Sequence, residues 1–255
     1  MSRRPPRKSL PIAARTRWTP DLLAAVAAGE RRALAPVLAR DDDKAPQEAA
    51  RLALDRALEL TRAALAREPP SRPIACAKGC SSCCVSKVVV TPPEALRIAS
   101  RLRSTLDPAA LAAVIARIAA ADDRARGLTR ARRLEERIPC PLLAEDGSCS
   151  VHEVRPLICA GWTSLDVGAC ERYFAAEGAG ASAPTYGLGY EIAGAVLAGL
   201  VQACADAGLD GTLLELIAAL RIALARPTAS ERWRRRLPVF ALARDAESAQ
   251  RLADG

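Results

Sequence analysis

The chain has 255 residues, half of them apolar, and only 3% are aromatic. This length can bury a sizeable core, which excludes a small scaffold that depends entirely on cross-links. A core of leucine and alanine with few aromatic or β-branched residues favours helices over sheets. We therefore expect a mostly α protein with little or no β structure.

The net charge of +8 is concentrated near the N-terminus. Residues 1–17 contain six basic side chains and no acidic ones, so the rest of the chain carries only +2. The basic residues are not interleaved with the aromatic residues that bind single-stranded nucleic acid. We interpret residues 1–18 as a disordered basic arm, and we do not expect a nucleic-acid partner.

The sequence also bears on location. No apolar run reaches the roughly 18 residues of a membrane span, so we expect no contact with a membrane. Arg3 and Arg4 are followed by prolines and further basic residues where an export signal needs an apolar core. An organelle transit peptide is the alternative for this segment, but we expect a cytoplasmic protein. Cysteines in that reducing compartment bind metals more often than they form disulfides.

The first elements form a helical hairpin over residues 19–68. Thr19 and Pro20 are typical of a helix start, and the helix should run to about residue 40. A second helix is expected over 46–67. The apolar faces predicted to point inward consist of Leu22, Leu23, Val26, Leu34 and Leu38 in the first helix and Leu54, Leu58 and Leu65 in the second.

The middle of the chain begins with an extended, proline-rich lead at 69–73. Val88–Val90 is a candidate short strand, and Thr91 with Glu94 is the signature of a capping box. The helix that follows should bury Leu96, Ala99, Leu102 and Leu106, and another, starting at Asp107-Pro108, should bury Leu111, Val114, Ile115 and Ile118. The charged segment 122–137 predicts a solvated helix or a mobile bridge.

The last third of the chain returns to helices. A helix over 186–207 carries Ile192, Val196, Leu200 and Cys204 at four-residue steps, and a helix over 212–225 follows Asp210-Gly211. The segment 178–184 reads as a linker, and the end from Pro227 is polar and basic. We thus divide the chain into a cysteine-cluster domain at 69–177, helices packing on it at 185–240, and a tail at 241–255.

Four cysteines occur within nine residues, in the spacing C-x3-C-x2-C-C. A thiol has a reference pKa of about 8.5 and is mostly neutral until a metal ion displaces its proton. The small residues Gly79, Ser81 and Ser82 let the backbone wrap closely around an ion. The pattern predicts metal ligation, with a redox dithiol as the alternative.

The spacing C-x3-C-x2-C also occurs in radical S-adenosylmethionine enzymes. Those enzymes usually have an aromatic residue before the third cysteine, where this chain has Ser82, and they need a β/α barrel downstream. The downstream sequence here is helical, and the adjacent Cys84 is a further mismatch. We therefore do not expect that class of enzyme.

A second cysteine stretch lies at 140–170 and contains Cys-Pro-Leu-Leu, a Gly-Ser-Cys turn and Arg-Pro-Leu-Ile-Cys. It has little helical periodicity, so a metal or tight packing must hold it. Over roughly 74–175 the two stretches resemble the YkgJ-like cysteine-cluster (CxxCxxCC) family. The resemblance implies a zinc- or iron-chelating domain. Two residues depart from the family pattern: His152 where Tyr is common, and Ala160 where Arg is usual.

The candidate metal ligands are eight cysteines: Cys76, Cys80, Cys83, Cys84, Cys140, Cys149, Cys159 and Cys170. They allow one centre or two. Cys204 lies on an apolar helix face and is interpreted as a core residue. His152, the only histidine, is expected to pack or to hydrogen-bond near the centre. Arg155 should pair with Glu153 or with loop carbonyls, and Trp162 and Tyr173 should cover the site.

Three functions remain open. The first is a metal-binding protein whose zinc, iron or iron–sulfur centre fastens irregular cysteine-rich loops to a helical scaffold. The second is an iron–sulfur enzyme that modifies proteins, because flagellin lysine N-methylases carry a similar cysteine pattern. The third is a metal storage or delivery protein. The chain has no Gly-rich nucleotide loop and no Ser–His constellation, so we favour the first, with a metal ion as the expected partner.

Overall fold

The computed structural model describes residues 18–175 and 185–247. These residues form ten α-helices, three short 3-10 helices and one two-stranded sheet, which confirms the mostly α fold. The predicted basic arm, apart from Trp18, lies outside the described residues, as do the linker at 178–184 and the part of the tail beyond residue 247.

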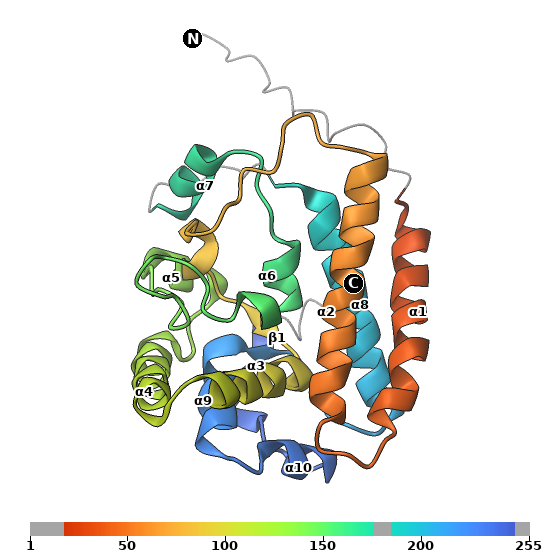
Figure 1. Ribbon diagram of the computed structural model, residues 1–255, viewed down its shortest axis with the longest axis vertical. Coiled ribbons are helices and arrows are strands. Elements are labelled where there is room, and N and C mark those ends of the chain that lie inside the picture. Colours follow the sequence, from red (N-terminus) through yellow and green to blue (C-terminus); the bar gives the residue numbers. More distant parts are fainter. Residues whose placement is uncertain (1–17, 176–184, 248–255) are drawn as a thin grey trace, which may run out of the picture.

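Three long helices lie side by side along one edge of the molecule (Figure 1). They are α1 (Pro20–Leu38), α2 (Ala45–Arg67) and α8 (Gly187–Asp206). The predicted cap of α1 is confirmed, because Thr19 Oγ1 accepts a hydrogen bond from the Leu22 amide at 3.2 Å. We refer to these three helices as the scaffold.

Small side chains let the scaffold helices approach closely. The buried face of α2 is made largely of alanines, namely Ala45, Ala49, Ala53, Ala57 and Ala64. On α8 the predicted row Ile192, Val196, Leu200 and Cys204 is fully buried, which confirms Cys204 as a core residue. Burial raises the pKa of its thiol to about 12.

The prediction of an inward-facing side chain is wrong at two positions. Leu22 at the start of α1 is 40% exposed, and Ile115 is also exposed. Both lie on the flank of an apolar stripe whose centre turns inward, at Leu34 in α1 and at Ile118 further on. The other predicted residues are buried or pack half-buried on the core, except that Leu23 and Leu65 join a second, smaller cluster.

By length and composition alone, α8 could cross a membrane. Core helices pass the same test, and more than half of the apolar window in α8 is buried against other elements, among them α1 and α2. The expectation that the chain has no membrane span therefore stays a prediction.

A second group of helices crosses the scaffold at one end (Figure 1). It consists of α3 (Pro92–Thr105), α4 (Pro108–Ala125) and α9 (Leu216–Ala225). The predicted strand exists as β1 (Val89–Val90), which pairs antiparallel with β2 (Leu214–Glu215). Because residues 214–215 extend to pair with β1, α9 begins four residues later than the predicted 212.

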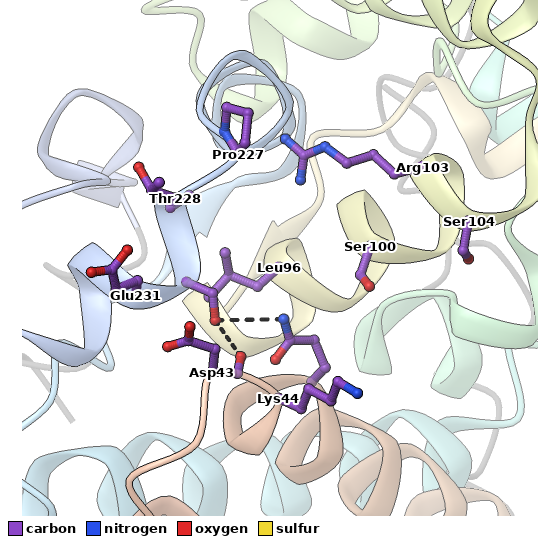
Figure 2. Close-up of a pocket in the computed structure, with 12 residues that line it drawn as sticks. Asp43, Lys44, Leu96, Ser100, Arg103, Ser104, Pro227, Thr228 and Glu231 are labelled. Carbon is purple, nitrogen blue, oxygen red and sulfur yellow. Dashed lines mark hydrogen bonds between the residues drawn. The ribbon is translucent and has the colours of Figure 1, made fainter.

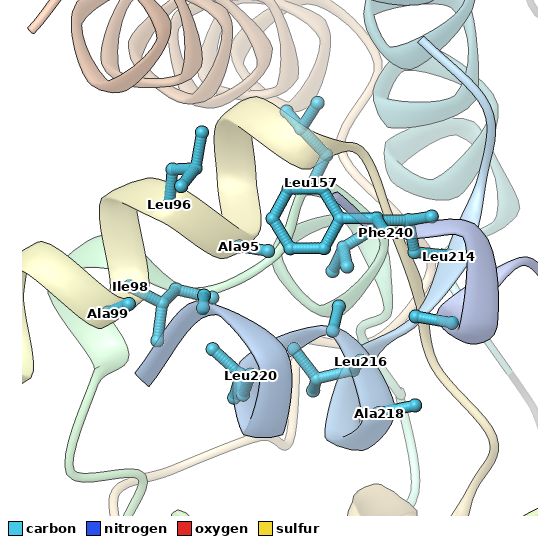
Figure 3. Packing of buried hydrophobic residues seen from close by; sticks show 14 of the residues in the cluster. Ala95, Leu96, Ile98, Ala99, Leu157, Leu214, Leu216, Ala218, Leu220 and Phe240 are labelled. Atoms are coloured by element: carbon cyan, nitrogen blue, oxygen red, sulfur yellow. The ribbon is translucent and has the colours of Figure 1, made fainter. Parts of the chain in front are cut away.

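Figure 3 shows how these elements share one core. Phe240 lies between α3 and α9, among Ala95, Leu214 and Leu216. The polar and basic C-terminal region thus contributes large buried residues, because α10 (Ala229–Arg234) also buries Trp233. Part of the predicted tail is likewise ordered into the 3-10 helix η3 (Ala241–Ala243). The predicted domain boundaries remain predictions, since this core includes residues from most segments.

The charged segment 122–137 is neither fully solvated nor a simple bridge. α4 continues to Ala125, and a short helix, α5 (Arg130–Glu135), follows. Asp122 is completely buried and Arg133 is only 2% exposed, so the prediction of a solvated segment is wrong at these two positions. The charge pattern alone does not show which of many charged residues turns inward.

Candidate metal centre

The first cysteine stretch is a tight loop followed by a 3-10 helix, η1 (Ser82–Val85). The Cys80 amide hydrogen-bonds the Ala77 carbonyl at 3.1 Å, and Gly79 has a φ of +88°. That conformation favours glycine, because other residues meet steric strain there. The loop therefore turns sharply enough to bring four cysteines into one small region.

The second cysteine stretch contains three short elements: η2 (His152–Val154), α6 (Leu157–Gly161) and α7 (Val167–Phe174). Cys159 lies on α6 and Cys170 on α7, whose first turn is capped by Asp166 through the Ala169 amide at 2.9 Å. Cys140 precedes these elements, and Cys149 bridges to Leu143. The stretch is thus a series of turns that each present one thiol.

The two stretches lie against each other, although 55 residues separate Cys84 from Cys140. The Cys140 amide donates to the Cys84 carbonyl at 2.7 Å. The Ser164 amide donates to Cys76 Sγ at 3.2 Å, and the Ala75 amide returns a bond to the Ser164 carbonyl at 2.8 Å. In Figure 1 the 3-10 helix η1 accordingly lies near α7, with which it makes contacts.

The eight candidate cysteines fall into two groups that share Cys83. The thiols of Cys76, Cys80 and Cys170 are electrostatic neighbours of one another and of Cys83, and we call them the outer set. Cys140, Cys149 and Cys159 are electrostatic neighbours of one another, and we call these three the inner set. Cys149 and Cys159 are also neighbours of Cys83. The side chain of Cys84 hydrogen-bonds Cys83. The adjacent pair therefore lies between the two sets.

Burial controls the protonation of these thiols. It raises the pKa of Cys140 to about 11 and that of Cys159 well above its ordinary value. The pKa of Cys83 is raised first by its hydrogen bond with Cys84 and then by burial. These groups are neutral thiols near neutral pH until something positive replaces their protons.

The donors fit zinc or iron by their chemistry, because thiolates bind both metals. Among the described residues, no three or more His, Cys, Asp or Glu side chains are already arranged to hold a metal ion. The assignment of the eight cysteines as ligands therefore stays a prediction. What the structure contributes is their convergence from two distant stretches.

Two residues that we did not predict as part of the site connect its pieces. Ser164 is buried and hydrogen-bonds both Cys76, through its amide, and the Cys170 side chain. Glu94 caps α3 as predicted, but its Oε1 also accepts the Leu157 amide at 2.8 Å and so fixes the start of α6. The capping-box pattern revealed the first role of Glu94, whereas its contact 63 residues away leaves no local signal.

The remaining predicted residues surround the cysteines. The Arg155 guanidinium donates to the His152 carbonyl at 2.8 Å and contacts its Nδ1 at 3.0 Å, so its partner is a loop carbonyl rather than Glu153. Glu153 pairs with Arg101 instead. Trp162 packs on Phe174 and Tyr190, while Tyr173 packs on Phe174.

One cavity lies away from the cysteines. It has a volume of about 540 Å³ and is lined from α2, α3 and α10 by side chains that include Lys44, Ser100, Arg103 and Glu231 (Figure 2). None of its lining residues is a cysteine. The cysteine region and this polar hollow are therefore separate features.

The fold and the converging thiols define a helical protein that carries a cysteine-cluster domain. Residues 75–173 match the model of the CxxCxxCC family, described as a putative zinc- or iron-chelating domain, so this segment carries a domain of that family. The match confirms the resemblance inferred from the cysteine motifs. No curated protein and no solved structure matches the chain.

Proposed function

We propose that the chain binds zinc or iron through its eight clustered cysteines and that the bound metal fastens the two cysteine stretches to each other. The observation that carries this proposal is their meeting, through the bond from the Cys140 amide to the Cys84 carbonyl and the thiol neighbourhoods around Cys83. A metal ion would replace the protons of these neutral, partly buried thiols and bind several sulfurs at once.

Two neighbouring centres account best for this arrangement. The outer set and the inner set each contain three cysteines, and each needs a fourth thiolate for the tetrahedral coordination that structural zinc prefers. Cys83 and Cys84 lie between the sets, and adjacent side chains tend to diverge. We therefore propose that one member of this pair completes each set.

The metal's role is structural in this proposal. The helices α6 and α7 of the second cysteine stretch have five and eight residues, and helices this short are not stable in isolation. This proposal includes a reducing compartment such as the cytoplasm, where cysteines bind metals more often than they form disulfides.

The test is a matched pair of cysteine variants in the full chain. Cys80→Ser removes a proposed ligand and should lose metal and folding stability together, because a structural metal contributes directly to folding. Cys204→Ser, at a fully buried core position on α8, should lose stability but keep its metal. Metal content measured by elemental analysis after anaerobic purification, together with thermal unfolding, gives both readouts.

The same samples distinguish the possible metals. A colourless protein with stoichiometric zinc supports a structural centre, whereas a brown protein containing sulfide indicates an iron–sulfur cluster. Metal that passes quickly to a competing chelator indicates storage or delivery. Full metal content and full stability in Cys80→Ser would contradict the ligand assignment.

A further inference from the structure

Arg133 is a buried cation with unused hydrogen-bond donors. It lies on α5, seven residues before Cys140, and its side chain is almost completely shielded from water. Its Nε and Nη1 atoms are buried and have no hydrogen-bond partner among the described residues. Buried arginines in folded proteins are normally paired and hydrogen-bonded, so these two nitrogens call for an explanation.

The charged groups around Arg133 leave its charge poorly compensated. Glu215 and Cys140 are its favourable neighbours, and Arg124 is an unfavourable one. Glu215 is engaged elsewhere, because its Oε2 accepts the Ala218 amide at 2.8 Å and caps α9. Burial also raises the pKa of Glu215, which weakens it as a counter-ion. The remaining neighbour, Cys140, belongs to the inner set.

We propose that Arg133 is the positioning residue that neutralises the inner set when its cysteines are thiolates. This inference rests on the metal centre proposed above and assigns it an electrostatic partner. Several thiolates around one divalent ion carry net negative charge, which is costly to bury without a nearby cation. The unpaired Nε and Nη1 atoms are free to donate to sulfur, as groups surrounding metal ligands commonly do.

The assignment is specific to the inner set. One member of the outer set, Cys76, is exposed, and the nearby cation Lys78 is itself exposed and pairs with Asp146 at 3.6 Å, whereas no member of the inner set is exposed. Water can therefore screen charge at Cys76, whereas burial raises the pKa of Cys140 and Cys159 in the inner set. Arg133 therefore stabilises the metal-bound protein, whereas its buried charge is uncompensated and destabilising in the metal-free protein.

The experiment compares Arg133→Met and Arg133→Lys with the unmodified full chain. Zinc dissociation constants are measured by chelator competition, and metal-free stability by denaturant unfolding. We expect Arg133→Met to bind the inner-set zinc about 10- to 100-fold more weakly, while its metal-free stability is unchanged or higher. Arg133→Lys should recover part of the affinity, because it keeps the charge but offers fewer donors.

Arg97→Met is the matched control. Arg97 is a half-buried arginine on α3 that donates to the Ala50 carbonyl at 3.4 Å, and its loss should leave zinc affinity unchanged. If the purified protein contains an iron–sulfur cluster, Arg133→Met should also lower its reduction potential, because a positive charge near a cluster favours the reduced state.

Two results would overturn the inference, and they are distinguishable. If Arg133→Met binds zinc like the unmodified chain but loses metal-free stability, Arg133 has only a packing role. If the unmodified chain binds neither zinc nor iron, the proposed metal centre itself fails and takes this inference with it. A metal-free protein that does not fold still allows the chelator competition, starting from the metal-bound protein.

Discussion

The scaffold and the cysteine region are stabilised in different ways. In the scaffold, the helices α1, α2 and α8 have 19 to 23 residues, and alanine faces with fully buried aliphatic rows pack them together. In the cysteine region, at 69–91 and 139–175, the elements are short and most of the cysteines are only half-buried. Burial of apolar surface can account for the first region, and in our proposal a bound metal adds to the stability of the second.

The two regions are nevertheless joined at defined points. Leu157, two residues before Cys159, is buried beside Ala95 and Leu96 of α3 (Figure 3). At the other end of α6, Gly161 lies against α8, and a Cβ placed on it would come within 2.6 Å of Ala193 Cβ. α6 is therefore an element that connects the cysteine region to the scaffold.

Metal removal should separate the two regions most strongly. Stripping the metal-bound protein with a chelator should expose the amides of 75–90 and 140–175 to hydrogen exchange, while those of α2 and α8 stay protected. We expect a loss of several kcal/mol in local opening free energy for the cysteine region, on the order of the contribution of a structural zinc. Hydrogen exchange followed by mass spectrometry gives this difference segment by segment.

Equal loss of protection in both regions would contradict this contrast. It would show that the scaffold cannot fold without the metal. Re-addition of zinc serves as the control, because protection that depends on metal should return with it.

Two glycine substitutions should sharpen the contrast. Gly161→Ala places a methyl group against α8, and Gly199→Ala places one within 2.6 Å of the Ala27 carbonyl where α8 crosses α1. Each should destabilise the protein by about 1–3 kcal/mol through overpacking. Only Gly161→Ala should also weaken metal binding, because α6 carries Cys159.

The measurement combines thermal unfolding with chelator competition for both variants. Equal metal affinity in the two variants would show that α6 does not transmit strain to the cysteines. Weaker binding in Gly199→Ala alone would reverse the assignment of the joining element.

Much of the scaffold could be predicted from local signals in the sequence. The cap at Thr19, the capping box at Thr91 and the four-residue row on α8 are chemical patterns within one or two turns of helix, and each is confirmed. The sequence was less informative where a residue's environment depends on segments that are distant in the sequence. The burial of Phe240 beside Ala95 and the pairing of β1 with β2 both bring together residues more than a hundred positions apart.

The cysteine region shows the same limit more sharply. The spacing of its cysteines was enough to predict a chelating domain of the CxxCxxCC family. The division into an outer and an inner set was not predictable, since it depends on how two loops meet at Gly79 and Gly147. Arg133 was hidden among the nine other charged residues of 122–137, because the sequence does not tell which guanidinium turns inward.

The smallest expected effect concerns a buried carboxyl in the scaffold. Glu30 on α1 is only 4% exposed, and burial raises its pKa from 4.5 to about 7, against the opposing effect of Arg56. Because the folded state holds this proton more tightly than the unfolded chain, wild-type stability should fall as pH rises from 4.5 towards 7 and then level off. Glu30→Gln removes the ionisable group, so the stability of this variant should not show that fall between pH 4.5 and 7.

The variant should therefore be close to wild type at about pH 4.5 and more stable by about 1–2 kcal/mol at about pH 8, since each pKa unit is worth about 1.4 kcal/mol and the amide must still be buried. Denaturant unfolding at the two pH values measures the difference, with Glu59→Gln at an exposed site of α2 as the control. Because Glu30 lies in the scaffold, the same gain should appear with and without metal. A gain that appears only in the metal-bound protein would show that the scaffold and the cysteine region do not respond independently.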